Sequence, residues 1–418
     1  MSANPDEVTL KDIYAARERI RSNCVETPLR HFANLSAISQ CQLYCKLETL
    51  QRCRAFKFRG AYNKLSTLPS GTTVVCASAG NHSQGVSLSA TLLGMKAMVY
   101  MPMTAPVSKV EATKSYGGTV IQHGLGFDAA YAKCKSDLES HPEWTFIPPF
   151  DDNLVIAGQG TIGLEIFEQL PEVDTVVVPV GGGGLASGVA IALKALKPSI
   201  RIVCVQSQTR PHTYMKFQKA KGRPIADLGP KFKGNPIADG INVINPGTIT
   251  FPYIEKLADE FVIVSEDEIV NAIALLAERA KIICEGAGAT SVAAVLSHKF
   301  SFRPDEKIVS VVSGGNIELQ MLSRCIDRAL FLWGRRIYFN VSIPLGTDEF
   351  IKMLKVLRSF HFEIISTTAF PNADTLANHI RYAVTADIPN PALIDEVKKE
   401  FDKNEWIINL TSTHASDE

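Results

Sequence analysis

The chain has 418 residues, enough for two or three domains and a large buried core. Its 43 basic and 43 acidic side chains cancel, which argues against a nucleic-acid or anionic-membrane partner and favours a small-molecule one. The first segment is acidic and amphipathic, and no stretch is apolar for the length of a membrane span, so secretion and membrane insertion are not expected.

Nine cysteines are scattered along the chain without paired CxxC spacing. This pattern is typical of reduced thiols and predicts a cytoplasmic protein without a zinc site.

Between residues 73 and 316, short β-branched runs alternate with longer amphipathic stretches, as in parallel βα units. The predicted strands are 73–78, 96–102, 119–124, 145–149, 175–180, 201–206, 260–265 and 307–313. The clearest helices between them are 81–93, 106–116 and 185–196. Strands that are apolar on both faces belong to sheets covered by helices on both sides. The fold class is therefore α/β, with open, twisted, mostly parallel sheets.

A different pattern begins near Trp333. The segments read as strand, helix, strand, strand, helix, strand: 335–344, 346–360, 362–370, 377–387, 390–403 and 406–413. A βαββαβ unit of this kind is compatible with a ferredoxin-like fold. We expect a catalytic domain over 1–328, with a smaller subdomain inserted at about 50–150, and a second domain over 334–414.

The first candidate site is the sequence AFKFRGA at 55–61. A solvated lysine at a helix start is the ordinary interpretation of Lys57. However, Phe56 and Phe58 flank it, and apolar surroundings lower the pKa of a lysine, which frees its amine to form an imine with an aldehyde.

The second is SAGNHSQG at 78–85, where a predicted strand ends and a helix starts. Asn81 can cap that helix, and the free amides of its first turn can hold a carboxylate such as that of an amino acid. The alternative is an ordinary turn, in which His82 is only a polar helix residue.

The third is the run Gly181, Gly182, Gly183 and Gly184 before Leu185, also between a strand and a helix. Consecutive glycine amides and a helix terminus can surround a phosphate. The same residues fit the relaxed pattern GxGxxA of nicotinamide enzymes, which expects an acidic residue after the next strand to bind a ribose. That strand ends at Gln206, so the dehydrogenase interpretation is weakened.

The fourth comprises Ser313, in SGGN at 313–316, and Glu285. A serine at the carboxyl end of a strand faces the crevice of a doubly wound sheet and can hydrogen-bond a pyridine nitrogen. A plain tight turn is the alternative. Glu285 lies among small and apolar residues, as a helix-breaking junction or a site carboxylate.

In this order the motifs AFKFRGA, SAGNHSQG, GGGGL, EGAGA and SGGN resemble the threonine dehydratase branch of the fold-type II pyridoxal-phosphate enzymes, over roughly residues 9–328. The resemblance implies pyridoxal 5'-phosphate as cofactor, bound to Lys57 as an imine. It places the cofactor phosphate at Gly181 to Leu185, the phenolic oxygen at Asn81 and the ring nitrogen at Ser313, near Glu285. The substrate carboxylate would bind the backbone of Ser78, Ala79, Gly80, Asn81 and His82.

Segments such as VIAGQGTIGLEI and PGTITF are more similar to the catabolic dehydratases, which bind AMP. The matching positions are Arg52, Gln84 and Asn316. The chain departs from the family pattern in two adjacent residues: Ala55 replaces the usual serine, and Arg54 replaces a glycine that catabolic members often have.

The resemblance implies dehydration and deamination of L-threonine, or L-serine, to 2-oxobutanoate or pyruvate and ammonia. A serine racemase of this fold has a catalytic serine where Ala79 stands, and a metal-binding glutamate where Gln206 stands, so racemisation is disfavoured and no metal site is predicted. A β-replacement synthase, and a non-catalytic amino-acid sensor in which Ala55 marks a decayed site, remain as alternatives.

The C-terminal unit resembles an ACT regulatory domain in element order. The acidic-x-Pro-Gly turn of such domains is matched in part by residues 343–346. The resemblance implies an allosteric enzyme with AMP or a branched-chain amino acid as effector, assembled as a homodimer or homotetramer.

Overall fold

The computed structural model describes residues 7–229, 234–370 and 377–410. The chain divides into two compact units, Met1–Met321 and Leu322–Glu418. The predicted second domain, 334–414, includes residues 371–376 and 411–414, which lie outside the described residues, as do residues 1–6 and 230–233 of the predicted catalytic domain. No helix in the described ranges is both long and apolar enough to span a membrane.

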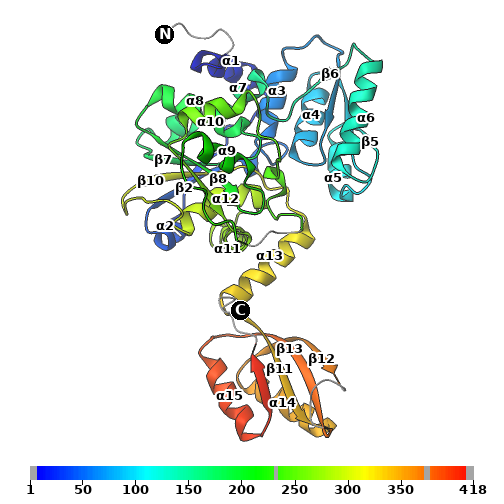
Figure 1. The fold of residues 1–418 in the computed structure, drawn as a ribbon, viewed down its shortest axis with the longest axis vertical. Helices are drawn as coiled ribbons and strands as arrows, with labels where there is room; N and C mark the ends of the chain where they lie inside the picture. The colour runs from blue at the N-terminus through cyan, green and yellow to red at the C-terminus, as the bar shows by residue number, and fades with distance from the viewer. Residues whose placement is uncertain (1–6, 230–233, 371–376, 411–418) are drawn as a thin grey trace. The chain divides into compact units, whose positions relative to one another are not determined.

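The first unit contains two sheets (Figure 1). The larger has the order β1-β2-β10-β7-β8-β9, and all its neighbours are parallel except β1 with β2. Its strands are β1 (Leu29–His31), β2 (Gln42–Leu47), β7 (Thr175–Pro179), β8 (Arg201–Ser207), β9 (Glu260–Val264) and β10 (Lys307–Val312). The smaller sheet is wholly parallel, with the order β5-β4-β3-β6. Its strands are β3 (Thr73–Ala77), β4 (Lys96–Met101), β5 (Thr119–Gln122) and β6 (Thr145–Phe146).

Helices cover the larger sheet on both sides. Figure 1 shows α8 and α10 on one side of its strands, and α11 and α12 on the other. The helices of this unit are α1 (Leu10–Ile20), α2 (Ala33–Ser39), α3 (Lys57–Leu65), α4 (Asn81–Leu92), α5 (Val107–Ser115), α6 (Phe127–Ser140), α7 (Asn153–Gln169), α8 (Gly184–Leu196), α9 (His212–Ala220), α10 (Thr250–Leu257), α11 (Glu266–Leu275) and α12 (Gly286–Leu296). Every residue of β7 is buried, as expected for a strand covered on both faces. The predicted α/β class with parallel sheets is confirmed.

All eight predicted strands from 73 onwards are present, but β1 and β2 were not predicted. β2 lies inside the larger sheet, parallel to β10. Its sequence, QLYCKL, has no β-branched residue and contains the charged Lys46, which is completely buried. Both properties are unusual for a central strand, so local pattern alone does not reveal it.

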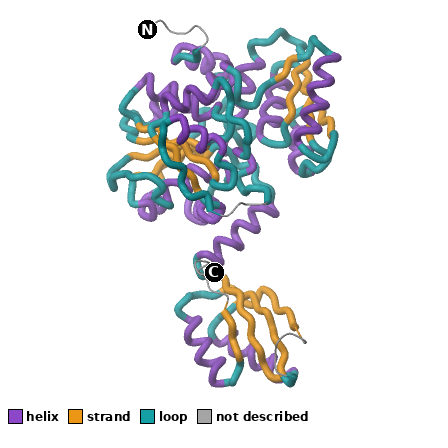
Figure 2. Tube along the Cα trace, viewed as in Figure 1, coloured by secondary structure: helices purple, strands orange, loops and turns teal. Residues whose placement is uncertain are grey.

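The second unit is an antiparallel sheet with the order β12-β13-β11-β14 (Figure 2). Its elements are β11 (Arg336–Pro344), α14 (Thr347–Ser359), β12 (Glu363–Phe370), β13 (His379–Asp387), α15 (Leu393–Lys403) and β14 (Ile407–Leu410). α13 (Leu319–Leu332) precedes them. The core of the unit includes Phe339, Leu357, Phe401 and Trp406, from the sheet, both helices and the segment before β14. The strand and helix order is the one that the sequence predicts.

Candidate active site

Lys57 is the first residue of α3, and its side chain is partly buried between aromatic rings. Its Nζ donates a 2.6 Å hydrogen bond to the carbonyl of Pro149 and lies 5.1 Å and 5.9 Å from the ring centres of Phe56 and Phe150. Burial lowers the pKa of Lys57 to about 8, against the opposing charge of Glu285. The amine is therefore neutral often enough, near physiological pH, to attack an aldehyde.

Backbone contacts hold the Lys57 segment beside Ser313. Phe56 N donates to Ser313 O at 3.0 Å, and Ala55 forms an isolated antiparallel bridge with Gly314. Arg54 has φ +60°, a left-handed conformation that glycine adopts without strain. Arg54 therefore holds a backbone conformation that a glycine would adopt at lower cost.

The glycine run lies between the end of β7 and the start of α8. Gly183 has φ +101°, and no side chain caps α8, so the first amides of the helix are available for an anion. A Cβ atom on Gly182 would lie 2.4 Å from the ring of Phe150, and one on Gly183 would lie 2.8 Å from the hydroxyl of Thr250. Only glycine fits this closely packed turn.

Three further residues of the site, Phe150, Asp151 and Thr250, were not predicted from the sequence. The Thr250 hydroxyl donates to the carbonyl of Gly182 at 2.5 Å. The Asp151 carboxylate accepts hydrogen bonds from the backbone N–H groups of Thr248, Ile249 and Thr250 at the start of α10. Burial alone would raise the pKa of Asp151, but these donors and the Thr248 hydroxyl hold it below its usual value. Segment 149–151 thus contacts both Lys57 and the glycine turn.

The turn at 78–82 lies between β3 and α4. Gly80, not Asn81, is the N-cap residue, and no side chain caps the helix, so the expectation that Asn81 caps it is wrong. A Cβ atom on Gly80 would meet no atom within 4 Å, so there is open space beside this turn. His82 is buried and its Nε2 lies 2.8 Å from Ile147 O. Burial, and then the charge of Lys57, lower the pKa of His82 to about 3, so the ring is neutral.

Asn81 instead contacts Glu285. Its Nδ2 donates to Glu285 Oε1 at 2.6 Å, and its Oδ1 accepts from Asn316 Nδ2 at 2.8 Å. Burial, and next the charge of Asp239, raise the pKa of Glu285 to about 7. Glu285 is also the N-cap residue of α12, so it is both a helix junction and a carboxyl group at this site.

Two of the three predicted effector residues lie together: Asn316 Nδ2 is 3.4 Å from Gln84 Oε1. The third, Arg52, is exposed, and among the described residues its side chain makes no hydrogen bond to either of them. Across the same described ranges, no group of three or more His, Cys, Asp or Glu side chains is placed to hold a metal. Gln206 is buried at the end of β8, where its Oε1 accepts from Tyr214 N, so the ribose-binding acid of a dinucleotide site is absent there.

Pyridoxal phosphate fits this set of groups. An amine with a lowered pKa and an uncapped helix start both contact segment 149–151, and the N–H groups of that helix start suit an anion. Gly314 packs against the side chains of both Glu285 and Asn81. A Cβ atom at this position would lie 2.4 Å from Glu285 Oε1 and 3.1 Å from Asn81 Nδ2. An amine, an anion site and a serine at the end of a parallel strand are the features that a fold-type II pyridoxal-phosphate enzyme needs.

Comparison with known proteins gives the same class. Residues 20–314 match the model of the family "Pyridoxal-phosphate dependent enzyme", and the chain belongs to that family. It is 42% identical to the L-threonine ammonia-lyase of Thermotoga maritima, over 86% of this chain and 88% of that protein. It is also 42% identical to the catabolic L-threonine dehydratase TdcB of Escherichia coli K12, over 76% of this chain and 95% of that one.

Solved structures agree with the fold. The processed form of threonine deaminase isoform 2 from Solanum lycopersicum superposes with a TM-score of 0.71 at 34% identity, over 78% of this chain and 89% of that one. Maize serine racemase superposes with a TM-score of 0.69 at 35% identity, over 77% and 98%. These similarities place the chain among enzymes that act on amino acids. The choice between elimination and racemisation depends on the residues of the site.

Proposed function

We propose that the chain is a threonine ammonia-lyase, which removes water and then ammonia from L-threonine, and from L-serine, to give 2-oxobutanoate or pyruvate. The observation that carries the proposal is the 42% identity to an L-threonine ammonia-lyase over 86% of the chain. Lys57, the glycine turn and Ser313 are the groups that would hold the cofactor.

Each residue has a definite task in this reaction. The N–H groups of Asn81 and His82 at the uncapped start of α4 bind the substrate carboxylate, and the open space beside Gly80 admits it. Lys57 Nζ, whose pKa is about 8, takes the proton from Cα. When bound, pyridoxal phosphate supplies a conjugated ring that disperses the negative charge left at Cα. The proton that Lys57 has taken passes to the β-hydroxyl, which leaves as water, and hydrolysis of the dehydrated product then releases ammonia and the 2-oxo acid.

Lys57→Ala tests the assignment of the lysine. We expect the variant to lose the visible absorbance of bound cofactor together with 2-oxo acid release from threonine. Lys96→Ala, at the exposed first residue of β4, is the control and should keep both. Retention of both signals by the Lys57 variant would refute the assignment.

Racemisation is the second candidate, because serine racemases of maize and Dictyostelium discoideum are similar in structure. Ala79 argues against it, since a methyl group cannot return a proton to the opposite face of Cα. Chiral chromatography of L-serine after incubation distinguishes the two reactions, and an equal accumulation of D-serine and pyruvate would overturn the preference for elimination.

We further propose that the C-terminal unit is an ACT-like regulatory module. Support comes from its βαββαβ order and from Gly346, which has φ +150° at the turn between β11 and α14 and matches the glycine of the partial acidic-x-Pro-Gly pattern. AMP, isoleucine and valine are the proposed effectors, and a homodimer or homotetramer is the proposed assembly. A reducing, cytoplasmic location is supported by nine cysteines that are all free thiols.

One assay tests the regulatory proposal. 2-Oxo acid release from threonine is measured with AMP, isoleucine or valine across a range of concentrations, beside the sedimentation velocity of the same samples. We expect at least one of these molecules to shift the threonine saturation curve. Superimposable curves under all conditions would contradict the module's regulatory role.

A further inference from the structure

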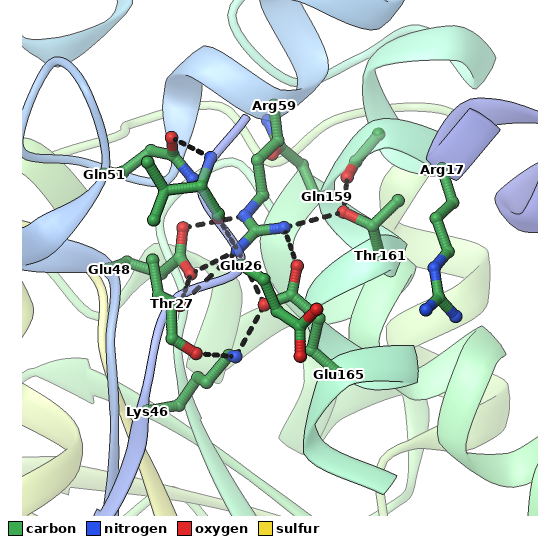
Figure 3. A network of polar contacts seen from close by, with 12 residues as sticks. Arg17, Glu26, Thr27, Lys46, Glu48, Gln51, Arg59, Gln159, Thr161 and Glu165 are labelled. Atoms are coloured by element: carbon green, nitrogen blue, oxygen red, sulfur yellow. Dashed lines mark hydrogen bonds and ion pairs between the residues drawn. The ribbon is translucent and has the colours of Figure 1, made fainter. Parts of the chain in front are cut away.

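A buried network of charges lies two residues beyond Lys57 on the same helix (Figure 3). It consists of Arg59, Glu48, Glu165 and Lys46, which we call the Arg59 network. The side chains of Arg59, Glu48 and Lys46 are completely inaccessible, and that of Glu165 is 9% exposed. Nothing in the proposed chemistry requires these four charges.

The guanidinium of Arg59 binds two carboxylates at once. Nε and Nη2 donate to the two oxygens of Glu48, each at 2.8 Å, and Nη1 and Nη2 donate to the two oxygens of Glu165. Nη1 also contacts the hydroxyl of Thr161 at 3.2 Å. Paired N–H groups in a planar fork fix both the position and the direction of a side chain, which a point charge does not.

Lys46 balances the charge of the network. Its Nζ donates to Glu165 Oε2 at 2.5 Å, to the carbonyl of Thr27 and, at 3.1 Å, to Gln169. The network therefore holds two positive and two negative side chains. Burial would raise the pKa of Glu48, but the charge and hydrogen bonds of Arg59 hold it below its usual value.

Four elements meet at the network: β2 supplies Lys46, the short helix 48–50 supplies Glu48, α7 supplies Glu165 and α3 supplies Arg59. α3 and α7 also pack closely. A Cβ on Gly158 would lie 2.7 Å from the carbonyl of Arg59, and one on Gly60 would lie 2.3 Å from the side chain of Gln159. The start of α3 is thus fixed against the larger sheet on several sides.

The presence of four buried charges is not accounted for by stability alone. The loss of hydration on burying ion pairs is often as large as their attraction, and apolar side chains of similar volume can replace them without loss of stability. Moreover, α3 has no side-chain N-cap, so the usual device that fixes the start of a helix is missing at Lys57. The two carboxylates on Arg59 supply the missing constraint.

We infer that Arg59 is a positioning residue, which through Glu48 and Glu165 fixes the start of α3 and so the direction of the Lys57 side chain. The inference rests on the proposed role of Lys57 as the cofactor lysine. Displacing a reacting group by about 1 Å can reduce a rate roughly 100-fold, so a small rotation of α3 has a large effect on Lys57 chemistry.

The test separates charge balance from geometry. Arg59→Met leaves two buried carboxylates with one lysine, so it should lower the melting temperature and the rate together. Arg59→Met combined with Glu48→Leu leaves Lys46 and Glu165 as a neutral pair, so stability should return. If Arg59 positions Lys57, kcat of the double variant stays about 100-fold below wild type, with a smaller change in KM.

A second measurement needs no substrate. Borohydride links pyridoxal phosphate to the lysine that binds it, and peptide mass spectrometry gives the rate of labelling at Lys57. We expect slower labelling in the double variant and in Arg59→Lys, which keeps the charge but loses the two-pronged contacts. Ile202→Ala, a cavity variant at the far end of β8, is the control for lost stability and should label normally.

Recovery of both kcat and the labelling rate in the stable double variant would overturn the inference and leave the network a purely structural feature. Absence of turnover on threonine by the wild-type protein would instead refute the proposed function. Labelling at Lys57 would still test the role of Arg59 in that case.

Discussion

Two turns in the first unit share a local design and differ in their surroundings. The glycine turn follows β7 and starts α8, and the turn at 78–82 follows β3 and starts α4. Neither helix has a side-chain cap, so both turns expose N–H groups to an anion. Yet a Cβ on Gly182 would collide with Phe150, whereas one on Gly80 would meet nothing within 4 Å.

The difference shows that local sequence locates an anion site, while packing from distant segments determines its character. Phe150 and the first turn of α10 pack closely against the glycine turn and fix its conformation. A rigid turn of this kind suits a cofactor phosphate that stays bound. The turn at 78–82 has free space on its open side, which suits a substrate that enters and leaves.

The largest effect is expected from Gly182→Ala, which tests the packed turn. The added methyl group overlaps the Phe150 ring, and overpacking of this kind costs about 1–3 kcal/mol. We expect the dissociation constant for pyridoxal phosphate to rise roughly 5- to 150-fold. Fluorescence titration of the apo-protein measures it.

The matched control combines Gly182→Ala with Phe150→Leu, which removes part of the colliding ring. Cofactor affinity should recover in part if the collision is the cause. Equal affinities of wild type and Gly182→Ala would show that the turn adapts, and the comparison between the two turns would fail.

A pH titration of cofactor uptake gives the next largest effect. Lys57 reacts as the neutral amine and has a pKa of about 8, so the uptake rate should rise about tenfold per pH unit below that value and level off above it. The pKa of Lys57 is about 8 in the folded chain and 10.5 in the unfolded chain, so between these pH values the unfolded chain binds more protons. The free energy of unfolding of the apo-protein therefore increases as pH rises from about 8 to 10.5.

Stopped-flow absorbance from pH 6 to 9.5 measures the uptake rate. Nα-acetyl-lysine, whose ε-amine is free and fully solvated, provides the reference curve. A profile parallel to that reference up to pH 9.5 would mean that burial does not tune Lys57. The packed side of the site would then lack the electrostatic role assigned to it.

Sequence alone predicts the parallel βα units, the C-terminal βαββαβ order and the motifs of the site, because each depends on local pattern. It does not predict which helix start is hydrogen-bonded by each of the adjacent carboxylates of Asp151 and Asp152. Asp152 caps its own helix, α7, while Asp151 binds the start of α10, about a hundred residues later. Nor does it reveal β2, since the partners that make a buried Lys46 acceptable come from α7.

The smallest effect, and the sharpest test of the open turn, is expected from Gly80→Ala. Gly80 has a negative φ of −136°, so alanine needs no left-handed backbone there, and its methyl group would occupy empty space, so cofactor absorbance should be unchanged. If the substrate carboxylate binds there, the methyl group competes with it. We expect KM for threonine to rise about fivefold, equivalent to ~1 kcal/mol, the low end of the cost of crowding by one added methyl group, with little change in kcat.

Gly126→Ala is a close control, because Gly126 is also a glycine N-cap with extended φ and no atom within 4 Å of a Cβ. It starts α6, which contributes no residue to the site. An unchanged KM in the Gly80 variant would place the carboxylate elsewhere. Loss of cofactor in that variant alone would instead mean that the space beside Gly80 closes when the cofactor binds, so the two turns would differ less than their packing suggests.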